Sequence, residues 1–193
     1  MQVLASSYSV HVLLPPAMDR RLRQWCAMSP GCDWPRWGGH ITLIPAFHLA
    51  VPLVRLIAAT ERSVQSRREF RVVLDEVRSE RHITKPGLYL VYLAGRHPTA
   101  NVELASLRAS LAAGLEGLKV DASPLVARHP FVPHISLTLG LPEPEALLLK
   151  ARAEQDGLHV TFRAKKISLV EQGSEPDGSP RYCLRDFRLR RQG

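Results

Sequence analysis

The tetrapeptide HITL at residues 40–43 returns in nearly the same form as HISL at residues 134–137. Both read histidine, apolar residue, hydroxyl residue, apolar residue. Alternate side chains of a β-strand point to opposite faces of the sheet. If both stretches are strands, each places its histidine and its hydroxyl on one face and its two apolar side chains in the core. The pair therefore predicts two half-buried strands that carry the same polar groups.

The elements around the two motifs follow the same order in both halves of the chain. The first half predicts strands over residues 8–14, 40–47 and 70–77, with helices over 17–27 and 52–65. The second half predicts strands over 88–94, 134–139 and 158–170, with helices over 101–118 and 144–154, and then a polar hairpin loop at 173–180 and a closing strand over 182–190. The order of strands and helices repeats after roughly 90 residues, and this period is too long for a solenoid. It predicts an α+β fold built from a duplicated unit, with two antiparallel sheets facing a central cleft and helices outside.

Length and composition are compatible with this architecture. The chain has 193 residues, of which 45% are hydrophobic and 23% charged, as in one ordinary globular domain. We therefore expect a single bilobal domain over 1–193, with repeat halves at about 1–80 and 86–193, and a monomer. No apolar run is long enough to span a bilayer. A signal peptide has a basic residue ahead of its apolar stretch, and this chain has none there, so a signal peptide is not expected.

The net charge favours anionic partners. Lysine and arginine outnumber aspartate and glutamate by 26 to 18, which gives +8 at pH 7. Such a surplus favours binding of RNA or nucleotides, although an arginine-rich solvated surface is an equally good interpretation of charge alone. The three cysteines are odd in number and no two have metal-ligand spacing, so a reducing, cytoplasmic compartment is expected.

Two imidazoles and two hydroxyls around one point suit the cleavage of a phosphodiester. A neutral imidazole can take a proton from the attacking hydroxyl or water, and a protonated one can give a proton to the leaving oxygen. The ordinary pKa of histidine, about 6.5, makes both forms available near neutral pH. The hydroxyls can hold the non-bridging phosphoryl oxygens. This scheme predicts His40, Thr42, His134 and Ser136 as catalytic residues and needs neither metal nor cofactor.

With its paired His-x-Thr/Ser-x motifs, the chain resembles the 2H phosphoesterase superfamily. It is most similar to the bacterial branch of LigT-like 2′-5′ RNA ligases and RNA 2′,3′-cyclic phosphodiesterases. The segment FVPH at residues 131–134 and the closing strand are part of the resemblance, which covers nearly the whole chain. It implies a bilobal fold with a basic cleft and metal-independent action on 2′,3′-cyclic or 2′-5′ phosphodiester ends, giving a 2′-phosphate. By analogy His134 would be the base and His40 the acid, but the pseudo-symmetry of the fold leaves these roles open.

The chain departs from some relatives in ways that bear on substrate binding. Leu139 stands where they have an arginine, five residues after the second histidine. Arg36 and Arg128, which precede the two motifs, are possible substitutes, although a solvated surface role suits each as well. Phe47 and Phe131 flank the motifs and could stack on a base, although an aromatic residue in such a position is also typical of a core.

Three other interpretations remain open. His82-Ile83-Thr84 imitates the motif, but Lys85 follows it and it is typical of a loop. A metal hydrolase is disfavoured because the chain has no His-Glu-x-x-His and no His-x-His, and carboxylates are missing around both motifs. A non-catalytic RNA-binding module with the same fold would keep the basic charge, and turnover of a 2′,3′-cyclic nucleotide separates it from an enzyme.

Overall fold

Strands are interspersed with helices along the chain in the computed structural model, which describes residues 6–174 and 180–191. The first half contains β1 (Ser7–Leu13), α1 (Pro16–Ala27), β2 (His40–Leu49), α2 (Leu53–Val64), β3 (Phe70–Leu74) and β4 (Glu76–Arg81). The second half contains β5 (Tyr89–Ala94), the 3-10 turn η1 (Pro98–Asn101), α3 (Val102–Gly114), β6 (Lys119–Asp121), α4 (Pro124–Arg128), β7 (His134–Ser136), α5 (Glu143–Gln155), β8 (Val160–Ala164), β9 (Lys166–Ser174) and β10 (Pro180–Arg188). The predicted α+β class is confirmed. Of the predicted hairpin loop, residues 175–179 lie outside the described part of the chain.

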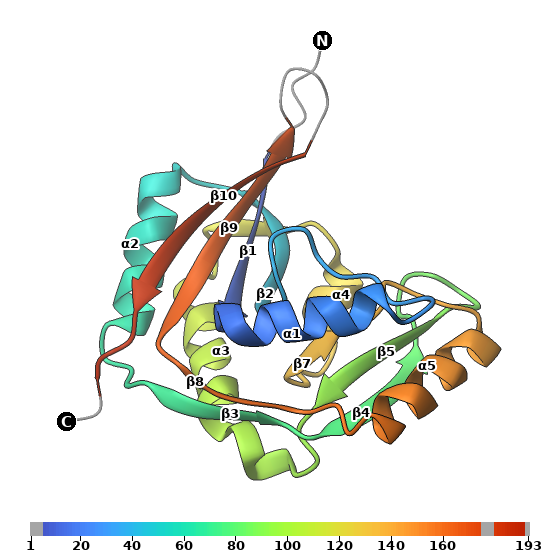
Figure 1. Cartoon of the computed structure of the whole chain (residues 1–193). Helices are drawn as coiled ribbons and strands as arrows, with labels where there is room; N and C mark the ends of the chain where they lie inside the picture. The colour runs from blue at the N-terminus through green and yellow to red at the C-terminus, as the bar shows by residue number, and fades with distance from the viewer. Residues whose placement is uncertain (1–5, 175–179, 192–193) are drawn as a thin grey trace.

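Across residues 6–174 and 180–191 the chain forms three antiparallel sheets (Figure 1). The largest has the strand order β10-β9-β1-β2-β6, a three-stranded sheet has the order β4-β5-β7, and β3 pairs with β8 in a two-stranded ribbon. Each larger sheet takes strands from both halves of the sequence, because β9 pairs with β1 and β4 pairs with β5. The two repeat halves that we propose for the sequence therefore do not coincide with the sheets.

Two stretches that the sequence predicts as single strands are each divided between two sheets. The stretch 70–77 breaks at Asp75, whose N–H donates to the carbonyl of Ala94 and whose carboxylate accepts from the N–H of Arg96. The stretch 158–170 breaks at Lys165, whose carbonyl accepts from the N–H of Leu189. At each break the chain leaves the β3–β8 ribbon and enters one of the larger sheets.

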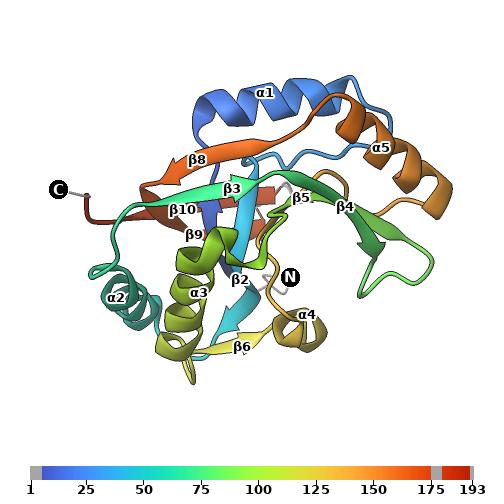
Figure 2. The ribbon, with the colours of Figure 1, turned by 90° about the horizontal axis from the view of Figure 1, so that it is seen from below.

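Helices cover the outer faces. Figure 2 shows α2 and α3 below the β3–β8 ribbon, and α1 and α5 on the other side. The leucines of α3 and of the residue that follows it are fully buried at positions Leu104, Leu107, Leu111 and Leu115. The segment between α3 and the second motif contains β6 and α4, and β6 extends the large sheet by pairing with the end of β2. Within the described residues no helix is both long and apolar enough to cross a membrane.

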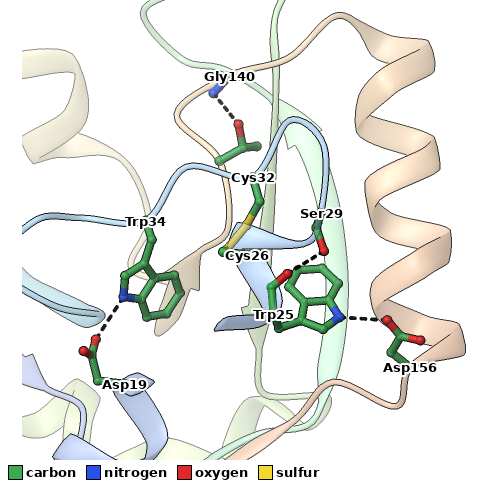
Figure 3. Close-up of a disulfide and its surroundings, with 9 residues drawn as sticks. Asp19, Trp25, Cys26, Ser29, Cys32, Trp34, Gly140 and Asp156 are labelled. Atoms are coloured by element: carbon green, nitrogen blue, oxygen red, sulfur yellow. Dashed lines mark hydrogen bonds between the residues drawn. A yellow bond between two sulfur atoms is a disulfide. The ribbon is translucent and has the colours of Figure 1, made fainter. Parts of the chain in front are cut away.

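The connection from α1 to β2 carries a disulfide bond between Cys26 and Cys32 (Figure 3). The sequence argument for a reducing, cytoplasmic compartment did not anticipate this bond. Nearby, the indole Nε1 of Trp34 donates to Asp19 at 2.9 Å, and the N–H of Asp33 donates to the carbonyl of Leu137 at 2.9 Å. The loop is thus anchored both to its own helix and to the segment that contains the second motif.

Candidate active site

The first motif lies at the start of β2, where this strand of the large sheet pairs with β1. Its apolar residues Ile41 and Leu43 are 1% and 0% exposed, so they form part of the core as predicted. In the ladder with β1, His40 is opposite Leu13 and Thr42 is opposite His11. Paired residues of an antiparallel ladder share a face, which places His11 on the same face as the motif histidine and hydroxyl.

The second motif forms β7, at the edge of the three-stranded sheet. Ile135 and Leu137 are both 0% exposed. In the ladder with β5, Ser136 is opposite Tyr92 and His134 is opposite Ala94. The two motifs therefore use the same device, an alternating strand that buries its apolar residues and presents an imidazole and a hydroxyl on the other face.

Both motif histidines are held by the carbonyl two residues before them. Nδ1 of His40 lies 3.0 Å from the oxygen of Gly38, and Nδ1 of His134 lies 2.7 Å from the oxygen of Val132. A carbonyl oxygen only accepts, so Nδ1 must carry the proton in each ring. In the neutral ring this leaves the lone pair on Nε2. The same contact fixes which nitrogen of each ring is available to take up or release a proton.

The structure brings the two motifs to one place. Strands β2 and β7 lie in contact, although they belong to different sheets. Thr42 and His134 line one cavity of about 180 Å³, together with residues of α3, α4 and the segment before the second motif. A positive charge on His134 also lowers the pKa of His40, which places the two rings within electrostatic reach of each other. His40 and Ser136 are not among the residues that line this cavity.

Burial is the main influence on both histidines. It lowers the pKa of His40 to about 4, against a smaller upward effect of the Gly38 carbonyl. Burial also lowers the pKa of His134, while the Val132 carbonyl and the Glu80 carboxylate act in the opposite direction. A low dielectric disfavours the charged form of a base, so both rings favour the neutral state before an anion binds.

Aromatic rings surround the first histidine. The indole of Trp37 stacks on His40 at 3.9 Å between centroids, and the ring of His11 meets His40 edge-on at 4.6 Å. His11 is 3% exposed, its Nε2 lies 2.6 Å from the Ser9 hydroxyl, and burial lowers its pKa well below the ordinary value. Sequence reasoning missed His11, although its position between Val10 and Val12 in an alternating strand was a signal that it shares a face with other polar residues.

The second histidine has a different neighbour in the equivalent place. The ring of Tyr92 lies 4.9 Å from that of His134. Burial and the Glu80 carboxylate raise the pKa of Tyr92, so its hydroxyl stays protonated near neutral pH. Tyr92 was also missed, because only the register of β5 against β7 places it beside the second motif.

The structure places the residues predicted to contact substrate in different environments. Phe47 is 0% exposed and packs against Tyr8 in the core, which makes its predicted stacking on a base wrong. Phe131 lines the cavity at His134, and the guanidinium of Arg108 lies 4.9 Å above its ring. Arg36 and Arg128 are exposed and are not part of that cavity lining. Arg108, which no sequence motif singles out, is the arginine that lines it.

The motif-like sequence at residues 82–84 forms a turn. Nδ1 of His82 accepts hydrogen bonds from the N–H groups of Thr84 and Lys85, both at 3.1 Å. His82 therefore has a local role in shaping the β4–β5 connection. Across residues 6–174 and 180–191, no group of three or more His, Cys, Asp or Glu side chains is arranged to hold a metal ion.

Comparison with known proteins identifies the family. The model of the 2′-5′ RNA ligase superfamily matches residues 14–176, which is most of the chain and includes both motifs. The chain belongs to the 2′-5′ RNA ligase superfamily. The resemblance drawn from the paired motifs is thereby confirmed at the level of the family, as a phosphodiester-processing enzyme family.

Solved structures support the same fold. Escherichia coli LigT in its apo form is 18% identical, with a TM-score of 0.60, and the match covers 96% of this chain and 98% of LigT. The protein TT0787 of Thermus thermophilus is 17% identical with a TM-score of 0.59, covering 97% and 100%. A structure described as a phosphoesterase is 19% identical with a TM-score of 0.57, covering 97% and 99%. A search of curated protein sequences found no match. At these identities the likeness establishes the LigT-like 2H phosphoesterase fold.

Proposed function

We propose that this superfamily member hydrolyses 2′,3′-cyclic phosphates of RNA or nucleotides by acid–base catalysis with two histidines. The observation that carries the proposal is the matched environment of His40 and His134. Each donates Nδ1–H to a carbonyl and keeps Nε2 for proton transfer, and each shares a strand face with a hydroxyl. In-line attack on a phosphodiester needs one such group on the entering oxygen and one on the leaving oxygen.

Atoms and protons balance in the proposed step. Neutral Nε2 of one histidine takes a proton from water while the water oxygen bonds to phosphorus. The bond from phosphorus to the 3′ oxygen breaks, and Nε2–H of the other, protonated histidine supplies the proton that makes the 3′-hydroxyl. The product is a 2′-phosphate. Thr42 and Ser136 donate hydrogen bonds to the non-bridging oxygens and hold the phosphorus in line.

The surroundings of the two histidines favour a particular division of roles. With its pKa lowered to about 4, His40 is neutral over most of the pH range and suits the base. The Glu80 carboxylate favours the charged form of His134, so His134 suits the role of the acid. We propose this assignment, which reverses the analogy drawn from the family resemblance. The same groups would serve 2′-5′ ligation if a ribose 5′-hydroxyl replaced water as the nucleophile.

A nucleotide substrate is also in keeping with the structural neighbours. LigT has been solved in complex with 3′-AMP and with ATP. The net charge of +8 in this chain favours the same class of anionic ligand.

The test is turnover of adenosine 2′,3′-cyclic phosphate, with the product separated from its 3′ isomer by chromatography. We expect 2′-AMP as the single product and an unchanged rate in EDTA. Turnover that EDTA abolishes and a divalent metal restores would refute metal-independent catalysis. Binding of the cyclic nucleotide without turnover would favour the non-catalytic RNA-binding module.

A further inference from the structure

The cavity next to the second motif has the chemistry of an anion site. Its lining includes Arg108, His129 and His134 and contains no aspartate or glutamate; the other members are Thr42, Leu43, Pro45, Ile83, Val126, Pro130, Phe131 and Val132. The imidazole of His129 is close enough for its charge to lower the pKa of His134. A concave site that holds an arginine and no carboxylate attracts anions.

Arg108 is presented to this cavity with its charge unneutralised. It projects from the middle of α3, is partly buried, and is held over the face of Phe131 at 4.9 Å. Among the described residues, no carboxylate lies within 4 Å of its guanidinium. Contact with a ring face leaves the in-plane N–H donors free, and their fork matches two oxygens of one phosphate.

Arg108 lines two hollows, and one of them contains no motif residue. This second hollow, of about 260 Å³, is also lined by Lys119 and by the carboxylates of Glu116 and Asp121. The cavity of about 180 Å³ at His134 is smaller than a typical site for a whole ligand. It therefore suits a part of the substrate next to the phosphate that reacts.

We propose that Arg108, positioned by Phe131, binds a second phosphate of the substrate, distinct from the one that is cleaved. The inference rests on the proposed function and narrows its substrate class. Preferred substrates would carry a phosphate in addition to the cyclic one. That phosphate can be an internucleotide linkage of an RNA end or the 5′-phosphate of a mononucleotide.

Binding of product analogues tests the subsite without relying on turnover. Titration calorimetry would compare adenosine 2′-monophosphate with adenosine 2′,5′-bisphosphate. We expect the wild-type protein to bind the bisphosphate about tenfold or more tightly, the scale of a charge-assisted contact. Arg108→Gln should remove this preference and Arg108→Lys should retain part of it. Arg62→Gln, which removes the same charge from the exposed end of α2, should leave it intact.

Kinetics then distinguish the two sources of the phosphate. The kcat/KM values would be compared for adenosine 2′,3′-cyclic phosphate, its 5′-phosphorylated form and a dinucleotide ending in a cyclic phosphate. A gain for the dinucleotide alone identifies an internucleotide phosphate, and a gain for the 5′-phosphorylated form alone identifies a terminal phosphate. In either case the gain should disappear in Arg108→Gln.

The outcomes separate the two proposals. A bisphosphate preference that depends on Arg108, without turnover of any cyclic phosphate, would support the subsite and refute the phosphodiesterase. Turnover with no preference for a second phosphate, or a preference that survives in a folded Arg108→Gln variant, would refute the subsite. Thermal unfolding of each variant checks that it is folded.

Discussion

The two motif strands are held alike but have unequal neighbours. Opposite the hydroxyl of the first motif, on the adjacent strand, lies His11, and opposite the hydroxyl of the second lies Tyr92. Each ring contacts the histidine of its own motif, at 4.6 and 4.9 Å between centroids. A near-symmetric scaffold thus places a titratable imidazole on one side of the site and a phenol on the other.

The difference extends to the next layer of residues. Trp37 covers His40, whereas the environment of His134 includes the carboxylate of Glu80. Equal tautomers with unequal electrostatic surroundings are what an acid–base pair requires, because one member must be neutral when the other is charged. The backbone therefore supplies the symmetry of the site, and the side chains beside it supply the asymmetry.

Removal of either motif histidine is the largest expected effect. His40→Ala and His134→Ala should each lower kcat/KM by roughly 10²–10⁴-fold, the scale of a lost general acid or base. The double variant should be little worse than either single one, because the pair acts as a unit. His48→Ala, an exposed histidine on the same strand as His40, is the matched control. A fully active, folded His40→Ala protein would eliminate the first motif from the chemistry.

The hydroxyls come next. Thr42→Val and Ser136→Ala each remove one hydrogen bond to the phosphoryl oxygens, a contact of about 1.5–3 kcal/mol when the partner is charged. A loss of about 10- to 100-fold in kcat is therefore expected, with the pH dependence unchanged. Equal losses would mean that the two motifs hold the phosphate equally. A loss confined to one variant would show that only one motif does.

The pH dependence of kcat/KM should be a bell with both limbs on the acid side of neutrality. His40 must be neutral, which requires a pH above about 4, and His134 must be charged, which requires a pH below its own lowered pKa and so below 6.5. Glu80→Gln removes a charge that raises the pKa of His134. The limb that His134 controls should move to lower pH, while Glu61→Gln on α2 should move neither limb.

Trp37→Leu makes the opposite test at the first motif. Exposing His40 relieves part of the burial that lowers its pKa, so the limb that His40 controls should move to higher pH. With His40 as base, the limb that it controls is the acid limb. Trp37→Leu moves this limb to higher pH and Glu80→Gln moves the alkaline limb to lower pH, so the two substitutions narrow the bell from both sides. A shift of the alkaline limb in Trp37→Leu would contradict the low pKa of His40 on which its assignment as base rests.

The smallest effect on rate is expected from the disulfide. Cys32→Ser should lower the free energy of unfolding by about 2 kcal/mol, the scale for closing so short a loop. The loss should appear in denaturant titrations under oxidising conditions and vanish in the presence of a reductant. The disulfide lies ahead of β2 and includes no motif residue, so kcat should change by less than about twofold. A large loss of activity with unchanged stability would contradict this.

Much of the site follows from local pattern. The strand period alone places His40 with Thr42 and His134 with Ser136, because Ile41 and Ile135 have to be buried. Sequence could not give the partners of these strands. His11, Tyr92 and Arg108 come to the site through strand register or from the side of a helix, and no local signal specifies either. Nor does an apolar run reveal that the chain changes sheets at Asp75, where side-chain and backbone hydrogen bonds outweigh the continuity of the hydrophobic pattern.

The interleaved sheets also have a consequence for the origin of the fold. Strand β4 from the first half completes the sheet of β5 and β7, and β9 from the second half completes the sheet of β1 and β2. A single copy of the repeated unit would leave β1 without its outer neighbour and β4 without any partner in its sheet. If the gene arose by duplication, its ancestor would have been a homodimer whose subunits exchanged strands. For the same reason, two fragments divided in the β4–β5 turn should not fold separately but should reassemble when mixed.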